Sequence, residues 1–179
     1  MFVVSNKVKI FIILSLLCNV VLFFLYKNAS DESEFRLKLL YRNFESGLIL
    51  NDIGLINAKE GHGKQHILHS YANLYKSSSS TDYVISRVNQ FVSPSEVTEI
   101  LSFYANVLEE WIVTDYEPSE EEYENMILDF QSIQHTLTSQ EGMRIKEQTM
   151  LDWSKNDFYR NIRTLKDSLI MYAEQERED

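Results

Sequence analysis

The sequence predicts an all-α protein, with a single N-terminal transmembrane helix followed by an irregular multi-helix bundle. Three observations support this fold class. The run from Ile10 to Tyr26 is mostly apolar and contains no charged residue. Beyond it, apolar residues recur three and four positions apart over several long segments, as on one face of a helix. Hydrophobic residues make up 44% of the 179 residues, enough to build a core, and only Pro94 and Pro118 interrupt the chain.

The apolar run predicts an uncleaved signal anchor. A transmembrane helix needs roughly 17 to 25 residues, so the run from Ile10 to Tyr26 is at the short end of that range. A cleaved signal peptide fits less well, because the nearby small-residue site would place Ala29 last and the charged Lys27 two residues before it. Lipoprotein attachment at Cys18 does not fit either, because the apolar run continues well beyond this residue.

The charges that flank the run predict its orientation. Lys7 and Lys9 precede it, whereas acidic residues follow it closely. By the positive-inside rule, the N-terminus lies in the cytoplasm. We therefore expect a single-pass cell-membrane protein. Residues 1–30 would form a short cytoplasmic tail and the anchor, and residues 31–179 an extracytoplasmic helical domain.

Within this domain, several segments carry an apolar stripe at helical spacing. Two of them also begin with a capping box, Ser93 with Glu96 and Ser119 with Glu122, in which side chains and backbone N–H groups of the first turn bond each other. Because each helix has one apolar face, each must bury that face against another helix, which predicts a bundle. The expected helices cover residues 34–49, 82–92, 93–113, 118–137, 143–153 and 154–179, and a further helix is considered through the histidine segment, from His62 to Lys76.

In the segment 82–92, β-branched residues would also suit a strand. Its apolar residues Val84, Val88 and Phe91 nevertheless keep a helical spacing, so we expect a helix. The serine-rich stretch just before it, over residues 77–82, predicts a flexible joint.

Three of the four histidines are clustered. On a helical wheel His62, His66 and His69 share one stripe, which faces away from the apolar residues. Two imidazoles four residues apart can bind one divalent ion. However, Gly61 and Gly63 loosen the first ligand, and no carboxylate on the stripe is placed to orient the rings. We expect a solvent-facing stripe and no metal, with a metal site at these histidines as the alternative.

The charge pattern restricts the possible partners. All 27 acidic residues follow Ser30, and the net charge is −10. An acidic surface repels phosphate backbones, so we expect no nucleic acid partner and favour neutral or cationic ones. The acidic cluster at 117–124 lies at a predicted helix start, where carboxylates interact favourably with the helix dipole. We therefore interpret it as a helix start, with a calcium site as the alternative. No nucleotide-binding, hydrolase or metalloprotease motif is present, so we expect neither an enzyme nor a cofactor.

The predicted function follows from these features. Ser15 and Asn19 share a stripe of the apolar run and are candidates for association between membrane helices. The sequence favours a membrane-anchored extracytoplasmic protein-interaction module. Its partners would be the lipid bilayer, through the N-terminal helix, and either a protein partner or a second copy. The alternative is a ligand- or metal-binding sensor domain that acts through a partner membrane protein.

Overall fold

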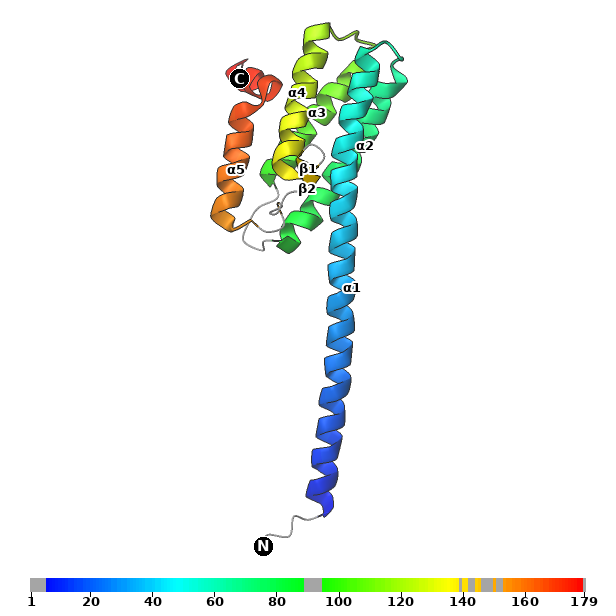
Figure 1. Cartoon of the computed structure of the whole chain (residues 1–179), viewed down its shortest axis with the longest axis vertical. Coiled ribbons are helices and arrows are strands. Elements are labelled where there is room, and N and C mark those ends of the chain that lie inside the picture. Colours follow the sequence, from blue (N-terminus) through cyan, green and yellow to red (C-terminus); the bar gives the residue numbers. More distant parts are fainter. Residues whose placement is uncertain are drawn as a thin grey trace. The chain divides into compact units, whose positions relative to one another are not determined.

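The computed structural model confirms a helical bundle (Figure 1). It describes the backbone of residues 6–88, 95–138, 140–141, 144–145, 150 and 153–178, and the side chains of residues 14–86, 95–138, 150 and 153–174. Two very short strands pair antiparallel, with Gln140 opposite Ile145. In these residues the elements are α1 (Asn6–Lys59), α2 (Gln65–Val88), α3 (Ser95–Val113), α4 (Glu120–Leu137), β1 (Gln140–Glu141), β2 (Arg144–Ile145), α5 (Lys155–Ser168) and α6 (Ile170–Glu178).

The chain divides into two compact units, Met1–Leu39 and Leu40–Asp179. The division lies later than the expected boundary after residue 30, because helix α1 continues through the polar residues that follow the apolar run. Two ion pairs between residues one turn apart support the helix there. They join Glu32 to Arg36 at 2.5 Å and Glu34 to Lys38 at 2.6 Å.

The prediction of a transmembrane anchor is wrong. Among the residues that the structure describes, no helix is both long enough and apolar enough to cross a membrane. The uncharged run extends only from Ile10 to Tyr26, at the short end of the roughly 17 to 25 residues that a membrane span needs. Lys27 then continues the same helix. The predictions of a single-pass topology, a cell-membrane location and an extracytoplasmic domain all depended on this anchor, so they are withdrawn together with it.

The core of the second unit lies between the part of α1 after Leu40 and helices α2 to α6 (Figure 1). Tyr104, Phe44 and Phe130 are among its largest fully buried side chains. The apolar stripes predicted for the two central helices are buried as expected. The buried members are Val97, Ile100, Leu101, Tyr104, Leu108 and Trp111 in α3, and Met126, Phe130, Ile133 and Leu137 in α4.

The serine-rich stretch 77–82 is part of helix α2 and is not a flexible joint. Its small side chains allow α1 and α2 to approach closely. A Cβ atom added to Gly47 of α1 would lie only 2.1 Å from the Ser77 Oγ atom. The Ser77 hydroxyl donates a hydrogen bond to the Phe44 carbonyl at 2.9 Å, and the Thr81 hydroxyl donates to the Ser77 carbonyl at 2.9 Å. The hydroxyls are therefore satisfied inside the bundle.

The helix expected over residues 154–179 is interrupted at Leu169, where α5 ends and α6 begins one residue later. The start of α6 is held by a side chain from another helix. The Asp129 carboxylate of α4 accepts hydrogen bonds from the backbone N–H groups of Ile170 at 2.6 Å and Met171 at 2.9 Å. Because these donors bond Asp129 and not α5, the two helices are separate.

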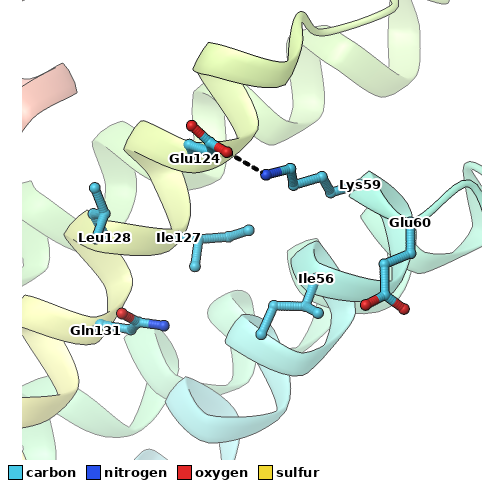
Figure 2. Close-up of a pocket in the computed structure, with 7 residues that line it drawn as sticks. All are labelled: Ile56, Lys59, Glu60, Glu124, Ile127, Leu128 and Gln131. Atoms are coloured by element: carbon cyan, nitrogen blue, oxygen red, sulfur yellow. Dashed lines mark hydrogen bonds and ion pairs between the residues drawn. The ribbon is translucent and has the colours of Figure 1, made fainter.

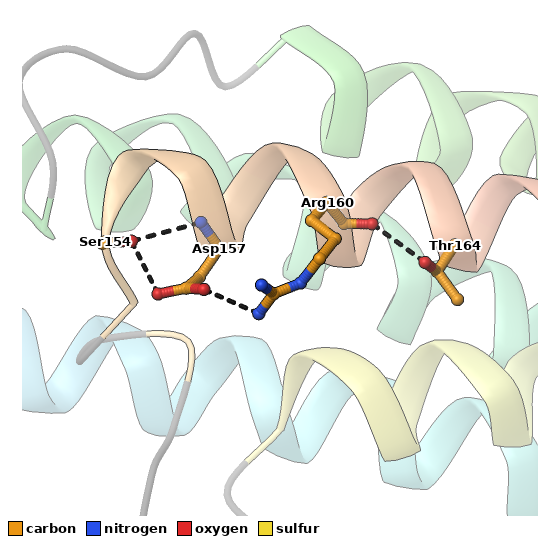
Figure 3. Close-up of polar contacts among 4 residues, drawn as sticks. All are labelled: Ser154, Asp157, Arg160 and Thr164. Carbon is orange, nitrogen blue, oxygen red and sulfur yellow. Dashed lines mark hydrogen bonds and ion pairs between the residues drawn. The ribbon is translucent and has the colours of Figure 1, made fainter.

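Helix α5 begins with a local cap (Figure 3). The Ser154 Oγ atom accepts a hydrogen bond from the Asp157 backbone N–H at 3.2 Å and donates one to the Asp157 carboxylate at 2.6 Å. The Arg160 guanidinium bonds the same carboxylate at 2.6 Å. Hydrogen bonding from Ser154 lowers the pKa of Asp157, and the nearby charge of Arg160 adds to this effect. The Thr164 hydroxyl donates to the Arg160 carbonyl at 3.0 Å, one turn further on.

Some expected features fall outside the described residues. These are the cap at Ser93, the end of the helix expected over 82–92, and most of the short helix expected over 143–153. Within the last segment, Arg144 and Ile145 form strand β2. The described part of 82–92 is helical to Val88, as the spacing of its apolar residues predicts.

Candidate functional site: a groove between α1 and α4

Helices α1 and α4 run antiparallel and are joined by polar contacts at both ends of their shared length. At one end the Lys59 ammonium contacts the Glu124 carboxylate at 2.5 Å. At the other end the Gln134 side-chain amide donates a hydrogen bond to the Leu48 carbonyl at 2.9 Å. The position at which α4 begins is set locally, because its capping box closes as the sequence predicts.

Between these contacts lies an open cavity with a volume of about 470 Å³ (Figure 2). Its apolar wall is made by Ile56 of α1 with Ile127 and Leu128 of α4. Leu128 is 50% exposed, and Ile53, one turn before Ile56 on α1, is also exposed. Leu128 therefore presents a large apolar side chain to water in the groove, whereas Ile56 and Ile127 are half-buried. The residues that line the groove are Ile56, Lys59, Glu60, Glu124, Ile127, Leu128 and Gln131.

The rim of the groove is acidic. Glu60 and Glu124 line it together with Lys59, and Glu120 lies 3.6 Å from the same lysine. The hydrogen bond to Glu124 raises the pKa of Lys59, so the lysine is charged and already paired. Three carboxylates against one ammonium give this rim a net negative charge, which attracts a cationic group.

A half-buried carboxyl group with one buried oxygen lies beside the groove. The Asp52 Oδ1 atom has no hydrogen-bond partner among the described residues. Burial raises the pKa of Asp52, because its charged form loses water. A hydrogen bond with Gln131, which lines the groove, lowers the same pKa. Asp52 therefore offers an oxygen that can accept a proton or a hydrogen bond.

The structure brings the three clustered histidines together on the surface. The ring centroids of His62 and His66 are 6.3 Å apart, and those of His66 and His69 are 5.8 Å apart, each pair edge to face. His62 lies in the turn before α2, because that helix begins only at Gln65. Among the residues described, no group of three or more His, Cys, Asp or Glu side chains is arranged to hold a metal ion.

A carboxylate does lie beside the histidine cluster, although the sequence analysis found none placed to orient the rings. The Glu60 Oε2 atom is 3.3 Å from the His62 Nε2 atom. It was missed because Glu60 belongs to the turn that ends α1, so it does not share the helical stripe of α2. Gly61 and Gly63 adopt positive φ angles of 83° and 104° and allow the chain to fold back there.

The other candidate residues are placed as follows. Ser15 and Asn19, the candidates for helix association, are exposed on α1, as is Cys18. The acidic cluster at 117–124 includes the first turn of α4, where the Glu122 carboxylate accepts a hydrogen bond from the Ser119 backbone N–H at 2.7 Å. These contacts agree with a helix start.

Sequence reasoning missed the groove, because its walls come from helices about seventy residues apart and follow no motif. One weak signal was available but was not used: Leu128 lies off the apolar stripe of α4, a position that leaves a large apolar side chain facing water. Comparison of the chain with protein-family models, with curated proteins and with solved structures finds no match.

Proposed function

We propose that this chain is a helical protein-interaction module. Its ligand is a partner helix with apolar and basic residues, which binds in the groove between α1 and α4. The observation that carries the proposal is the combination of an apolar wall, made by the exposed Leu128 with the half-buried Ile56 and Ile127, with an acidic rim. A groove between two antiparallel helices suits a third helix, whose apolar side chains enter at intervals of three and four residues.

The wall and the rim have separate roles in this proposal. Burying Leu128 and its neighbours supplies most of the binding free energy, since removal of apolar surface from water is the dominant favourable term in association. The acidic rim selects the partner, because like charges placed together are costly and opposite charges speed the encounter. A basic amphipathic helix satisfies both requirements, whereas an acidic one satisfies only the first.

The apolar wall is tested with a synthetic amphipathic helix of leucine and lysine, labelled for fluorescence anisotropy. We expect it to bind the full chain, and we expect Leu128→Ser to weaken binding at least about tenfold, a change equivalent to about 1.4 kcal/mol. Leu68→Ser is the matched control, because Leu68 of α2 is 51% exposed but does not line the groove. Equal loss in both variants, or no binding by the intact chain, would contradict the proposal.

The rim is tested with the same peptide. The double variant Glu60→Gln with Glu124→Gln keeps the shape of the groove and removes two negative charges, so binding should weaken and depend less on salt. A peptide of leucine and glutamate should bind the intact chain more weakly than its lysine counterpart. If the two peptides bound equally, the rim would not select the partner.

The cavity and the Asp52 carboxyl favour a second candidate function, a small-ligand sensor. A volume of about 470 Å³ lies within the usual range for small-molecule pockets, which combine apolar walls with a few polar groups. In that case a small apolar dye should bind saturably, and Leu128→Ser should abolish its binding while peptide binding is absent. Binding of the peptide in preference to the dye favours the interaction module.

A further inference from the structure

The break between α5 and α6 has no local cause in the sequence. From Lys155 to Glu178 the chain contains neither glycine nor proline, the residues that most often end a helix. Leu169 occupies the cap position of α6, because its carbonyl accepts the first bond of that helix, from the Ala173 N–H. Leucine has no side-chain oxygen that could bond the first N–H groups. The local sequence therefore favours one continuous helix over these residues.

Side chains from two other helices supply the cap that the sequence lacks at this point. The Asp129 carboxylate of α4 accepts hydrogen bonds from the N–H groups of Ile170 and Met171 at 2.6 and 2.9 Å. The Tyr104 hydroxyl of α3 donates to the same carboxylate at 2.6 Å. The first turn of α6 contains no acidic residue of its own, so Asp129 also supplies the negative charge that suits a helix start. The separate start of α6 therefore depends on its contact with α4.

The ring of Tyr172 provides a second anchor for α6. It packs edge to face against Phe103 of α3, with the ring centroids 5.3 Å apart, and its hydroxyl donates a hydrogen bond to the Glu99 carboxylate at 2.5 Å. Lys166, in the last turn of α5, contacts the same carboxylate at 3.1 Å and lies 5.5 Å from the centre of the Tyr172 ring. The docking of α6 thus rests on a few side chains of α3 and α4.

At the junction, other groups take the place of the backbone bonds that a continuous helix would make. Leu169 is extended, with a ψ angle of 121°, and its N–H bonds the Lys166 carbonyl at 3.2 Å. The Ser168 hydroxyl donates to the Leu165 carbonyl at 2.7 Å, which is the acceptor that the Leu169 N–H would use in an α-helix. The φ angle of Leu169 is −81°, so a change of its ψ angle to about −42° makes it helical. One residue can therefore exchange one set of bonds for the other.

We propose that α6 is a releasable latch. In its second state Leu169 becomes helical, α6 continues α5 as one helix, and the surface around Asp129 and Phe103 is uncovered. With nine residues, α6 is too short to be stable as an isolated helix, so on release it is stabilised by extending α5. Leu169 is the hinge of this two-state element. The latch is separate from the proposed groove function, because Asp129 does not line that cavity.

Opposing effects act on the two states. The docked state makes the hydrogen bonds to Asp129 and buries Leu169 and Tyr172, which are 1% and 6% exposed. It also removes water from the Asp129 carboxylate, and this burial raises the pKa of Asp129. Release returns water to the carboxylate and gives the N–H groups of α6 new acceptors in α5. Loss of a single docking contact should therefore shift the population toward the continuous helix.

The distance between the start of α5 and the middle of α6 distinguishes the two states. Cysteines replace the exposed residues Asn156 and Glu174 in a full-length Cys18→Ser chain, and spin labels on them are measured by double electron–electron resonance. In one continuous helix these positions lie about 27 Å apart and on the same face. Because α6 turns away from the axis of α5, the distance is shorter in the docked state (Figure 1, red). We expect the intact chain to show mainly the shorter distance.

Substitutions at the two anchors should release the latch. Asp129→Asn keeps the shape of the side chain but replaces one acceptor oxygen with an N–H donor, so we expect the population at the long distance to rise several-fold. Tyr172→Phe removes only the hydrogen bond to Glu99 and should act in the same direction by less, so the test does not depend on one variant folding. Glu122→Gln is the matched control, because the Glu122 carboxylate also accepts a backbone N–H, but in the cap of α4.

A proline at the hinge tests how α6 leaves. Proline tolerates the φ angle of Leu169 but is unfavourable inside a helix, so Leu169→Pro added to Asp129→Asn should abolish the long distance. Persistence of the long distance with proline, or an equal rise in Glu122→Gln, would contradict the assigned hinge. Only the short distance in both Asp129→Asn and Tyr172→Phe would show that α6 does not release. A broad distribution, with loss of helix by circular dichroism, would show that α6 unravels and does not extend α5.

Discussion

Replacing Asp129 with alanine should destabilise the bundle by about 3 kcal/mol, since this carboxylate joins three helices. Asp129 is only 1% exposed. It accepts hydrogen bonds from the Tyr104 hydroxyl of α3 at 2.6 Å and from the backbone N–H groups of Ile170 and Met171 at the start of α6. Burial raises the pKa of Asp129, whereas these three hydrogen bonds lower it.

The magnitude follows from what the substitution leaves behind. Loss of a helix cap costs about 1 kcal/mol, and this part applies to the start of α6. The Tyr104 hydroxyl is fully buried, so it cannot turn to water, and a buried donor without a partner costs about 1 to 3 kcal/mol. For a domain of this size, a loss of about 3 kcal/mol lowers the melting temperature by roughly 6 to 12 °C.

The assay is urea unfolding of the full chain, followed by far-ultraviolet circular dichroism. Asp157→Ala is the control, because Asp157 lies in the first turn of α5 and its contacts are exposed, so its loss should cost at most about 1 kcal/mol. Tyr104→Phe completes a double-mutant cycle, in which the two positions should couple by about 1 kcal/mol or more. A loss from Asp129→Ala no larger than the control, or additive variants, would refute the reasoning.

Three further substitutions test other parts of the fold. Gly47→Ala should destabilise the protein by about 2 kcal/mol or more in a thermal melt, because the added Cβ atom would lie 2.6 Å from the Asn73 carbonyl oxygen. This loss is expected even though alanine favours a helix. An unchanged melt would show that α1 and α2 can separate at no cost. Ser119→Ala should cost about 1 kcal/mol in urea unfolding by opening the capping box with Glu122, and a neutral result would show that the box adds nothing. Burial raises the pKa of Asp52 in the folded state, so the folded protein binds more protons than the unfolded one between the two pKa values. The free energy of unfolding therefore falls as the pH rises through that window. Asp52→Asn should remove this fall, and an unchanged pH profile of stability would contradict the assignment.

The helices of the second unit could be predicted because their signals are local. The box of Ser119 and Glu122 links residues three apart, and it forms as the sequence implies. The buried stripes of α3 and α4 follow from spacings of three and four residues, which depend only on the pitch of a helix. The joint expected at residues 77–82 was wrong, because serine content alone does not show that Ser77 will lie against α1.

The sequence by itself determined that this protein is helical, where most helices lie, and which faces are apolar. Only the tertiary structure decided that Asp129 interrupts the last helix at Leu169, and that Ile56 and Leu128 form one apolar wall. The physical reason is distance along the chain. Caps and stripes are set within one or two helical turns, whereas a groove or a carboxylate bridge depends on which helices become neighbours, and packing of the whole chain settles that choice.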